Sequence, residues 1–223
     1  MMKILSALIA GAAAAAPIEQ VHIALAAENE MRISFKAHTS EPLTCVYNNL
    51  TSAPSTVRSY FPGGGYYHHV LLQDLTPSAV YTYSCAGSAA FSFTAPPAAS
   101  VFAPFSMAVF GDWGYLGSKE RGPSLPVGGL SSNWSAVPVR ELLEDLKDAG
   151  KISMILHAGD LVYADDAFGE HPLQFQYENV TDGWFNWIQN LSASLPYHVS
   201  VGNRAWRPRR AARAPPSYSP PPL

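Results

Sequence analysis

The stretch "ISMILHAGDLVYAD", residues 152–165, decides the architecture of the second half of this 223-residue chain. A nearly continuous apolar run leads to Gly159 and Asp160, which is the pattern of a strand buried on both faces. A glycine at the end of such a run lets the backbone turn sharply, so that the next side chain projects from the strand's end. The stretch therefore predicts a buried strand that presents Asp160 at its carboxyl end.

The same pattern, an apolar run followed by glycine and an oxygen-bearing side chain, occurs twice more in the sequence. It is found in "FSMAVFGDWG", residues 105–114, where it ends in Asp112, and in "YHVSVGN", residues 197–203, where it ends in Asn203. One glycine–aspartate pair is a common turn, but two such pairs and one glycine–asparagine pair, in register at the ends of three apolar runs, favour a shared site.

Two helices are predicted between these strands. Residues 138–146 carry an apolar stripe at helical spacing, with Pro138 near the start and Gly150 beyond the end. The stripe consists of Val139, Leu142, Leu143 and Leu146. A second helix is predicted over residues 173–192. The order β-α-β-α-β implies parallel strands, whose carboxyl ends meet at one edge of the sheet.

Oxygen-bearing side chains gather at that predicted edge. Asp112, Asp160 and Asn203 come one from each strand, and the phenol of Tyr163 follows Asp160 by three residues. Converging oxygen ligands are what a hard cation needs, so the edge is a candidate metal site. His157 lies within the predicted strand and is interpreted as a core or edge residue.

The first half of the chain reads as an all-β sandwich. Short apolar–polar alternating segments are separated by Pro, Gly and Ser, and no helical period survives between them. The expected strands are 21–25, 31–37, 44–47, 66–72, 80–84 and 91–94. The proline-rich stretch 93–105 is interpreted as a linker to the second half.

One corner of this sandwich has a specific signature. "LTPSAVYTY", residues 75–83, resembles the corner of fibronectin type III domains, in which the hydroxyl of a tyrosine, here Tyr81, bonds to upstream backbone. Cys85 falls on the same face as Tyr81 and points inward. A disulfide to Cys45 would contribute about 4 kcal/mol on the chain-entropy model; the alternative is two free buried thiols.

The three glycine motifs resemble a known family. "GDWG", "GDLVYAD" and "GN" are similar to the first three of five metal-binding blocks of purple acid phosphatases, written GDxG, GDxxY, GNH[ED], VxxH and GHxH. The resemblance covers residues 18–203 and implies a fibronectin III-like sandwich (17–97). An incomplete α/β metallophosphoesterase domain (98–203), the first part of an αββα sandwich, would follow it.

The resemblance also implies a dinuclear metal centre and a reaction. Asp112 and Tyr163 would bind Fe(III), Asp160 would bridge to a second Fe, Zn or Mn, and Asn203 would bind that second metal. Such a centre hydrolyses phosphate monoesters by metal-hydroxide attack, although nucleotides or phosphodiesters remain alternative substrates. No specific nucleic acid is expected as a partner.

The sequence departs from the family after Asn203. Arg204 stands where the family's GNH histidine would be, so the catalytic residue is unknown, and neither VxxH nor GHxH follows. We therefore expect this chain to be inactive. Residues 204–223 hold five Arg, six Pro and no acid, and are interpreted as a frameshifted, misspliced or disordered end. The alternative is a non-catalytic secreted binding module with a cationic tail.

The beginning of the chain predicts export. Residues 1–16 have one Lys, a short apolar run and an Ala-x-Ala site, as in a signal peptide for a secreted or vacuolar protein. No later stretch approaches the 18 apolar residues of a membrane span. Two cysteines and four candidate glycosylation sites fit this route: Asn49, Asn133, Asn179 and Asn190.

Overall fold

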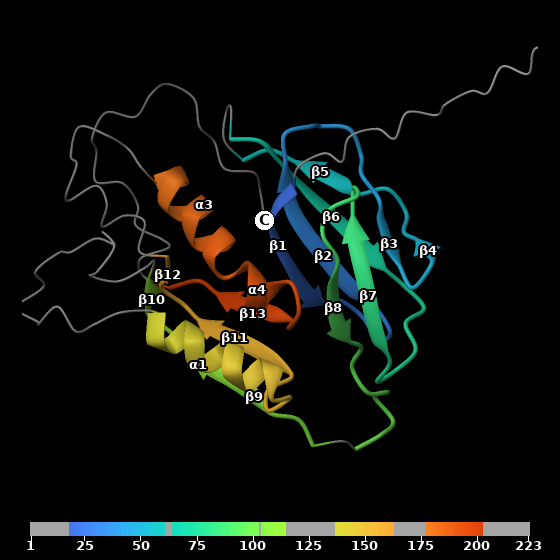
Figure 1. The fold of residues 1–223 in the computed structure, drawn as a ribbon, viewed down its shortest axis with the longest axis vertical. Helices are drawn as coiled ribbons and strands as arrows, with labels where there is room; N and C mark the ends of the chain where they lie inside the picture. Colours follow the sequence, from blue (N-terminus) through green and yellow to red (C-terminus); the bar gives the residue numbers. More distant parts are fainter. Residues whose placement is uncertain (1–17, 61–63, 103, 115–136, 163–176, 203–223) are drawn as a thin grey trace, which may run out of the picture.

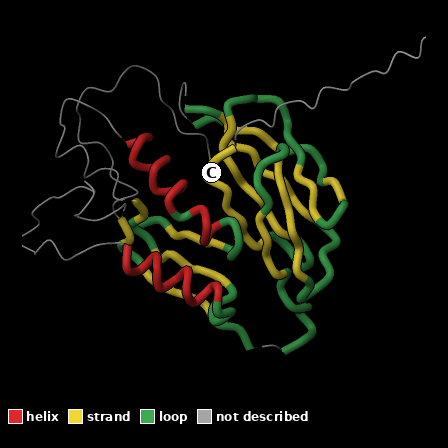
Figure 2. The backbone as a smooth tube through the Cα atoms, viewed as in Figure 1, coloured by secondary structure: helices red, strands yellow, loops and turns green. Residues whose placement is uncertain are grey.

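A computed structural model describes residues 18–60, 64–102, 104–114, 137–162 and 177–202. These residues form a β-sandwich followed by an α/β region, side by side (Figure 1). In the part of the chain that the structure describes, the sandwich is built from strands and loops, and the helices belong to the α/β region (Figure 2). The predicted two-part fold class is confirmed.

The sandwich consists of two antiparallel sheets with strand orders β1-β2-β6-β5 and β4-β3-β7-β8. Its strands are β1 (Ile18–Leu25), β2 (Met31–Ala37), β3 (Cys45–Tyr47), β4 (Leu50–Thr51), β5 (Thr56–Arg58), β6 (Tyr66–Leu72), β7 (Val80–Cys85) and β8 (Phe91–Thr94). All six predicted strands are found. The short strands β4 and β5 were not predicted.

Alternation along β7 explains how its residues build the core. Tyr81, Tyr83 and Cys85 are buried, whereas Val80 and Thr82 face solvent. The amide of Thr76 donates a hydrogen bond of 2.8 Å to the hydroxyl oxygen of Tyr81, as the corner signature predicts.

A disulfide joins Cys45 of β3 to Cys85 of β7. The two residues are register partners on neighbouring strands of one sheet, and both side chains are buried. The bond closes a sequence separation of 40 residues, which on the chain-entropy model stabilises the fold by about 4 kcal/mol.

The α/β region is built on a three-stranded parallel sheet of order β13-β11-β9. Its elements are β9 (Met107–Phe110), β10 (Trp113–Gly114), α1 (Val137–Asp148), β11 (Met154–Ala158), β12 (Leu161–Val162), α3 (Tyr177–Trp187), α4 (Gln189–Ser192) and β13 (Tyr197–Ser200). The three apolar runs are therefore parallel strands, as predicted. The second predicted helix is divided between α3 and α4.

A second core lies between this sheet and its helices. Its fully buried side chains are Ile155, Trp184, Ile188 and Leu191. Part of the sheet lies outside this core: Met107 and Val109 of β9 are 38% and 58% exposed.

The apolar stripe of α1 predicts the helix correctly, but only half of the stripe is buried. Leu143 is 4% exposed and Leu146 packs against the core, but Val139 and Leu142 are 39% and 57% exposed. The helix therefore contacts the core through the Leu143–Leu146 side alone. None of the helices that the structure describes is long and apolar enough to span a membrane.

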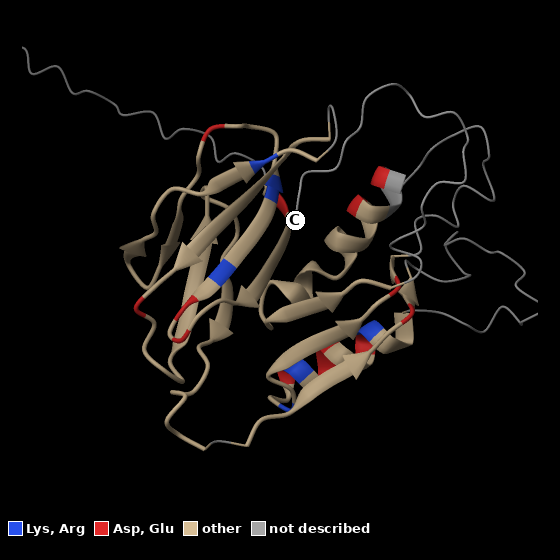
Figure 3. Cartoon of the chain, turned by 180° about the vertical axis from the view of Figure 1, so that it is seen from behind, with Lys and Arg blue, Asp and Glu red and all other residues tan. Residues whose placement is uncertain are grey.

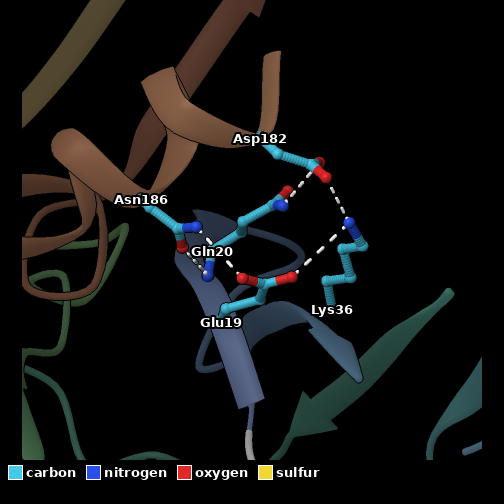
Figure 4. A network of polar contacts seen from close by, with 5 residues as sticks. All are labelled: Glu19, Gln20, Lys36, Asp182 and Asn186. Atoms are coloured by element: carbon cyan, nitrogen blue, oxygen red, sulfur yellow. Dashed lines mark hydrogen bonds and ion pairs between the residues drawn. The ribbon is translucent and has the colours of Figure 1, made fainter. Parts of the chain in front are cut away.

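A polar network joins the two parts (Figure 4). Lys36, which is buried, forms ion pairs with Asp182 of α3 and, at 3.4 Å, with Glu19 of β1. Gln20 donates to Asp182 (2.7 Å), and Asn186 donates to Glu19 (3.1 Å). Burial disfavours the charged form of Lys36, but the hydrogen bond and charge of Asp182, assisted by Glu19, raise its pKa. The network thus holds α3 against β1.

Candidate metal centre

The strands β9 and β11 end in the same kind of turn. Asp112 and Asp160, which follow the terminal glycines, have φ angles of 56° and 48°. This left-handed conformation is uncommon outside glycine, although aspartate tolerates it better than most residues. The amide of Asp112 donates to the carbonyl of Gly159 at 3.3 Å, so the two turns are bonded to each other.

The glycines of the three motifs pack together. A Cβ on Gly111 would lie 2.9 Å from the carbonyl oxygen of Ala158, and one on Gly159 would lie 3.0 Å from the Cα of Gly202. A Cβ on Gly202 would approach the amide nitrogen of Asp160 to 2.1 Å and its Oδ1 to 2.2 Å. Only glycine fits at these contacts, so the three strand ends meet at one place, which we call the metal edge.

Beyond the turns the chain continues in register. β10 and β12 pair in parallel, with Trp113 opposite Leu161 and Gly114 opposite Val162. Asp112 and Asp160 immediately precede these paired residues, so they occupy equivalent positions on neighbouring segments. Seen from behind, acidic residues mark the turns at this end of the parallel sheet (Figure 3).

His157 is a buried residue of β11, close to the metal edge. The side chain is fully buried, its Nδ1 lies 2.9 Å from the hydroxyl oxygen of Tyr197, and its ring is 5.0 Å from that of Phe110. Burial lowers the pKa of His157 to about 4, while the charges of Asp112 and Asp160 oppose this fall. The imidazole is therefore neutral, and it is close enough to interact electrostatically with both carboxylates.

Two buried polar atoms near the metal edge lack hydrogen-bond partners within the described part of the chain. They are Nε2 of His157 and Nε1 of Trp184, whose ring centroids lie 5.8 Å apart. The expectation that His157 is a core residue agrees with its burial. Its bond to Tyr197 was not predicted, because no short-range signal links two residues 40 positions apart.

The remaining predicted ligands, Tyr163 and Asn203, lie outside the described residues, directly after Val162 and Gly202. Among the described residues, no three His, Cys, Asp or Glu side chains come together as a complete metal cage. The described part contributes Asp112 and Asp160, which follow two neighbouring strands, and the three closely packed glycines of the motifs. Oxygen donors of this kind fit a hard cation such as Fe(III) or Mn(II).

The candidate glycosylation sites are distributed over both parts. Asn49 is exposed in the turn between β3 and β4. Asn190 on α4 is also exposed, and its side-chain amide lies 3.3 Å from Glu144. Asn133 lies outside the described residues, and of Asn179 only the backbone position on α3 is described.

Comparison with known proteins gives a consistent result. The family model described as "Purple acid Phosphatase, N-terminal domain" matches residues 18–96. The chain is 29% identical over 195 residues to purple acid phosphatase 21 of Arabidopsis thaliana, covering 83% of this chain and 37% of that protein. It is 31% identical over 145 residues to acid phosphatase type 7 of Danio rerio, covering 63% of this chain and 26% of that protein.

A solved structure agrees with the fold. The structure of a purple acid phosphatase from yellow lupin (Lupinus luteus) seeds matches with a TM-score of 0.62 at 15% identity, over 84% of this chain and 35% of that chain. At this identity the likeness concerns the fold alone. The chain thus spans less than two fifths of the length of each of these three proteins.

Proposed function

Because this chain belongs to the purple acid phosphatase family, we propose that the metal edge is part of a dinuclear centre of the type that hydrolyses phosphate monoesters in acid phosphatases. The observation that carries this proposal is the packing of the three glycine motifs. Gly202 touches Asp160, and the amide of Asp112 bonds to the turn that carries Asp160. The backbone turns that carry Asp112 and Asp160 are thereby held next to each other, which would allow both carboxylates to serve one metal site.

Each predicted ligand then has a role. Asp112 and Tyr163 would hold Fe(III), Asp160 would bridge the two metals, and Asn203 would hold the second, which is Fe, Zn or Mn. When bound, such a pair of cations polarises a phosphoryl oxygen and lowers the pKa of water. Asp112 and Asp160 both follow their strands in left-handed turns, and the buried, neutral His157 adds no charge next to them.

Within these 223 residues we assign only part of the ligand set of this centre. Residues 204–223 contain no histidine, and Arg204 follows Asn203 where the family's substrate-contacting histidine would stand. The ligands that we assign are all oxygen donors, and no nitrogen donor completes the set. We therefore expect the 223-residue chain to bind metal weakly and to hydrolyse phosphate esters at a rate near background.

Loading the purified chain with Fe(III) tests the ligand assignment, because a phenolate bound to iron absorbs visible light. We expect a violet band that Tyr163→Phe abolishes and that Asp160→Asn weakens by loss of iron. Asp148→Asn is the matched control, since Asp148 lies on α1 and its side chain is 71% exposed.

Turnover of p-nitrophenyl phosphate is measured on the same samples. An iron-loaded chain whose colour survives both Tyr163→Phe and Asp160→Asn would refute the assignment of the site. Rapid turnover by the native chain would refute the expectation that the oxygen ligands alone are insufficient.

A further inference from the structure

The outer edge of β1 is covered by side chains instead of a neighbouring strand. β1 is an edge strand of its sheet, and α3 and α4 lie against it. The amide of Gln20 donates to Asn186 (3.1 Å), and the amide of Val21 donates to Gln189 (2.8 Å). The hydroxyl of Ser192 donates to the carbonyl of Val21 at 2.9 Å. An open strand edge is thus satisfied by polar groups of the α/β region.

This cover continues onto β13, the strand that leads to the third glycine motif. The amide of Leu25 donates to Nε2 of His198 at 3.2 Å, and Ile23 forms a parallel bridge with Pro196. Among the described strands, β13 is the edge strand of its own sheet and pairs with β11 on one side only. Its other side therefore faces β1, and the two sheets are joined edge to edge.

The turn that precedes β13 is held by the sandwich as well. The hydroxyl of Tyr83, a residue only 1% exposed, donates to the carbonyl of Ala193 at 2.7 Å. Both the entrance to β13 and its second residue, His198, are therefore bonded to sandwich residues that are more than 100 positions away in the sequence.

We propose that the β-sandwich positions the third glycine motif of the metal edge, and that His198 is the positioning residue through which it does so. A four-residue strand paired on one side has few restraints of its own. Gly202 follows His198 by four residues and packs directly against Asp160, so a shift of β13 along β11 displaces the surroundings of that carboxylate. The sandwich thus acts on the metal edge indirectly, by fixing the position of β13.

Two substitutions of His198 separate loss of the hydrogen bond from loss of the imidazole ring. His198→Leu removes the acceptor of the Leu25 amide, whereas His198→Gln places an amide oxygen near the position of Nε2 and keeps an acceptor. Asn48→Ala is the matched control, because Asn48 accepts from the backbone amide of Thr82 at 3.1 Å elsewhere in the sandwich. It removes a bond of the same kind away from the α/β region.

Amide hydrogen exchange of Leu25 and of residues 197–202 is the first readout. We expect His198→Leu to accelerate this exchange by about tenfold or more, since a partly buried amide loses its acceptor, and His198→Gln to stay within about threefold of the native rate. Asn48→Ala should leave exchange at 197–202 unchanged. Equal acceleration across β2 and β6 in His198→Leu, or a His198→Gln variant that behaves like His198→Leu, would overturn the proposal.

The dissociation constant for Mn²⁺ is the second readout, and it alone rests on the proposed function. We expect His198→Leu to weaken Mn²⁺ binding by about threefold or more and His198→Gln to restore it. A native chain that does not bind Mn²⁺ would contradict the metal site, while the exchange rates would still decide whether His198 positions β13.

Discussion

Replacing His157 by glutamine should flatten the dependence of folding stability on pH. The side chain of His157 is fully buried, and burial lowers its pKa from 6.5 to about 4 against the opposing charges of Asp112 and Asp160. Because the folded state resists protonation, the contribution of the neutral imidazole to stability is complete above pH 6.5. It is lost as the pH falls toward 4, where the folded protein also binds the proton.

The size of the effect follows from these two pKa values. A tenfold change in proton affinity corresponds to about 1.4 kcal/mol. The native chain should therefore lose about 2 kcal/mol through His157 between pH 7.5 and pH 5, and about 3 kcal/mol by pH 4. Other groups also titrate over this range, so the difference between native and variant chains isolates His157.

Urea unfolding at pH 7.5, 6.0 and 5.0 measures this difference. Glutamine at 157 can still hydrogen-bond with Tyr197 but does not titrate, so its free energy of unfolding should fall by about 2 kcal/mol less than that of the native chain. His38→Gln, which removes an exposed histidine, is the control and should follow the native chain. Parallel curves for native and His157→Gln would refute the reasoning.

Two further predictions concern packing and charge. Gly202→Ala places a Cβ 2.1 Å from the amide nitrogen of Asp160 and should lower Mn²⁺ affinity by calorimetry at least about tenfold. Gly150→Ala, which has open space but a φ of 62°, should cost only about 1 kcal/mol and leave that affinity unchanged. Asp182→Asn leaves Lys36 with Glu19 as its remaining anionic partner in Figure 4 and should lower the free energy of urea unfolding at pH 7 by about 1–2 kcal/mol. A loss below about 0.5 kcal/mol would show that the network contributes little.

Local patterns predicted much of this fold because the features concerned depend on neighbours in sequence. The apolar run before Gly159 specifies a buried strand, and the alternation along Val80–Cys85 specifies which tyrosines enter the core. The spacing from Leu75 to Tyr81 specifies a corner whose hydrogen bond is present. In each case one short segment contains the whole signal.

Contacts between distant segments were not predictable in the same way. Nothing near His198 indicates that its imidazole accepts from Leu25, 173 residues earlier, and nothing near Gln20 indicates Asn186. The exposure of Leu142 also escaped prediction, because helical spacing gives the width of an apolar stripe but not how much of it finds a partner. The metal edge was predicted from its glycine motifs. The burial of His157 against Tyr197 and the contact of His198 with the sandwich depend on tertiary packing.

Titration of the chain with Mn²⁺ tests the central claim most directly, namely that carboxylates from two strands serve one metal site. Native protein, Asp112→Asn, Asp160→Asn and the double variant are compared by calorimetry, with Asp148→Asn as the control. We predict that each single variant weakens binding at least about tenfold, and that the double variant is little weaker than the worse single one. Two independent, additive losses, or native affinity in either single variant, would contradict a shared site.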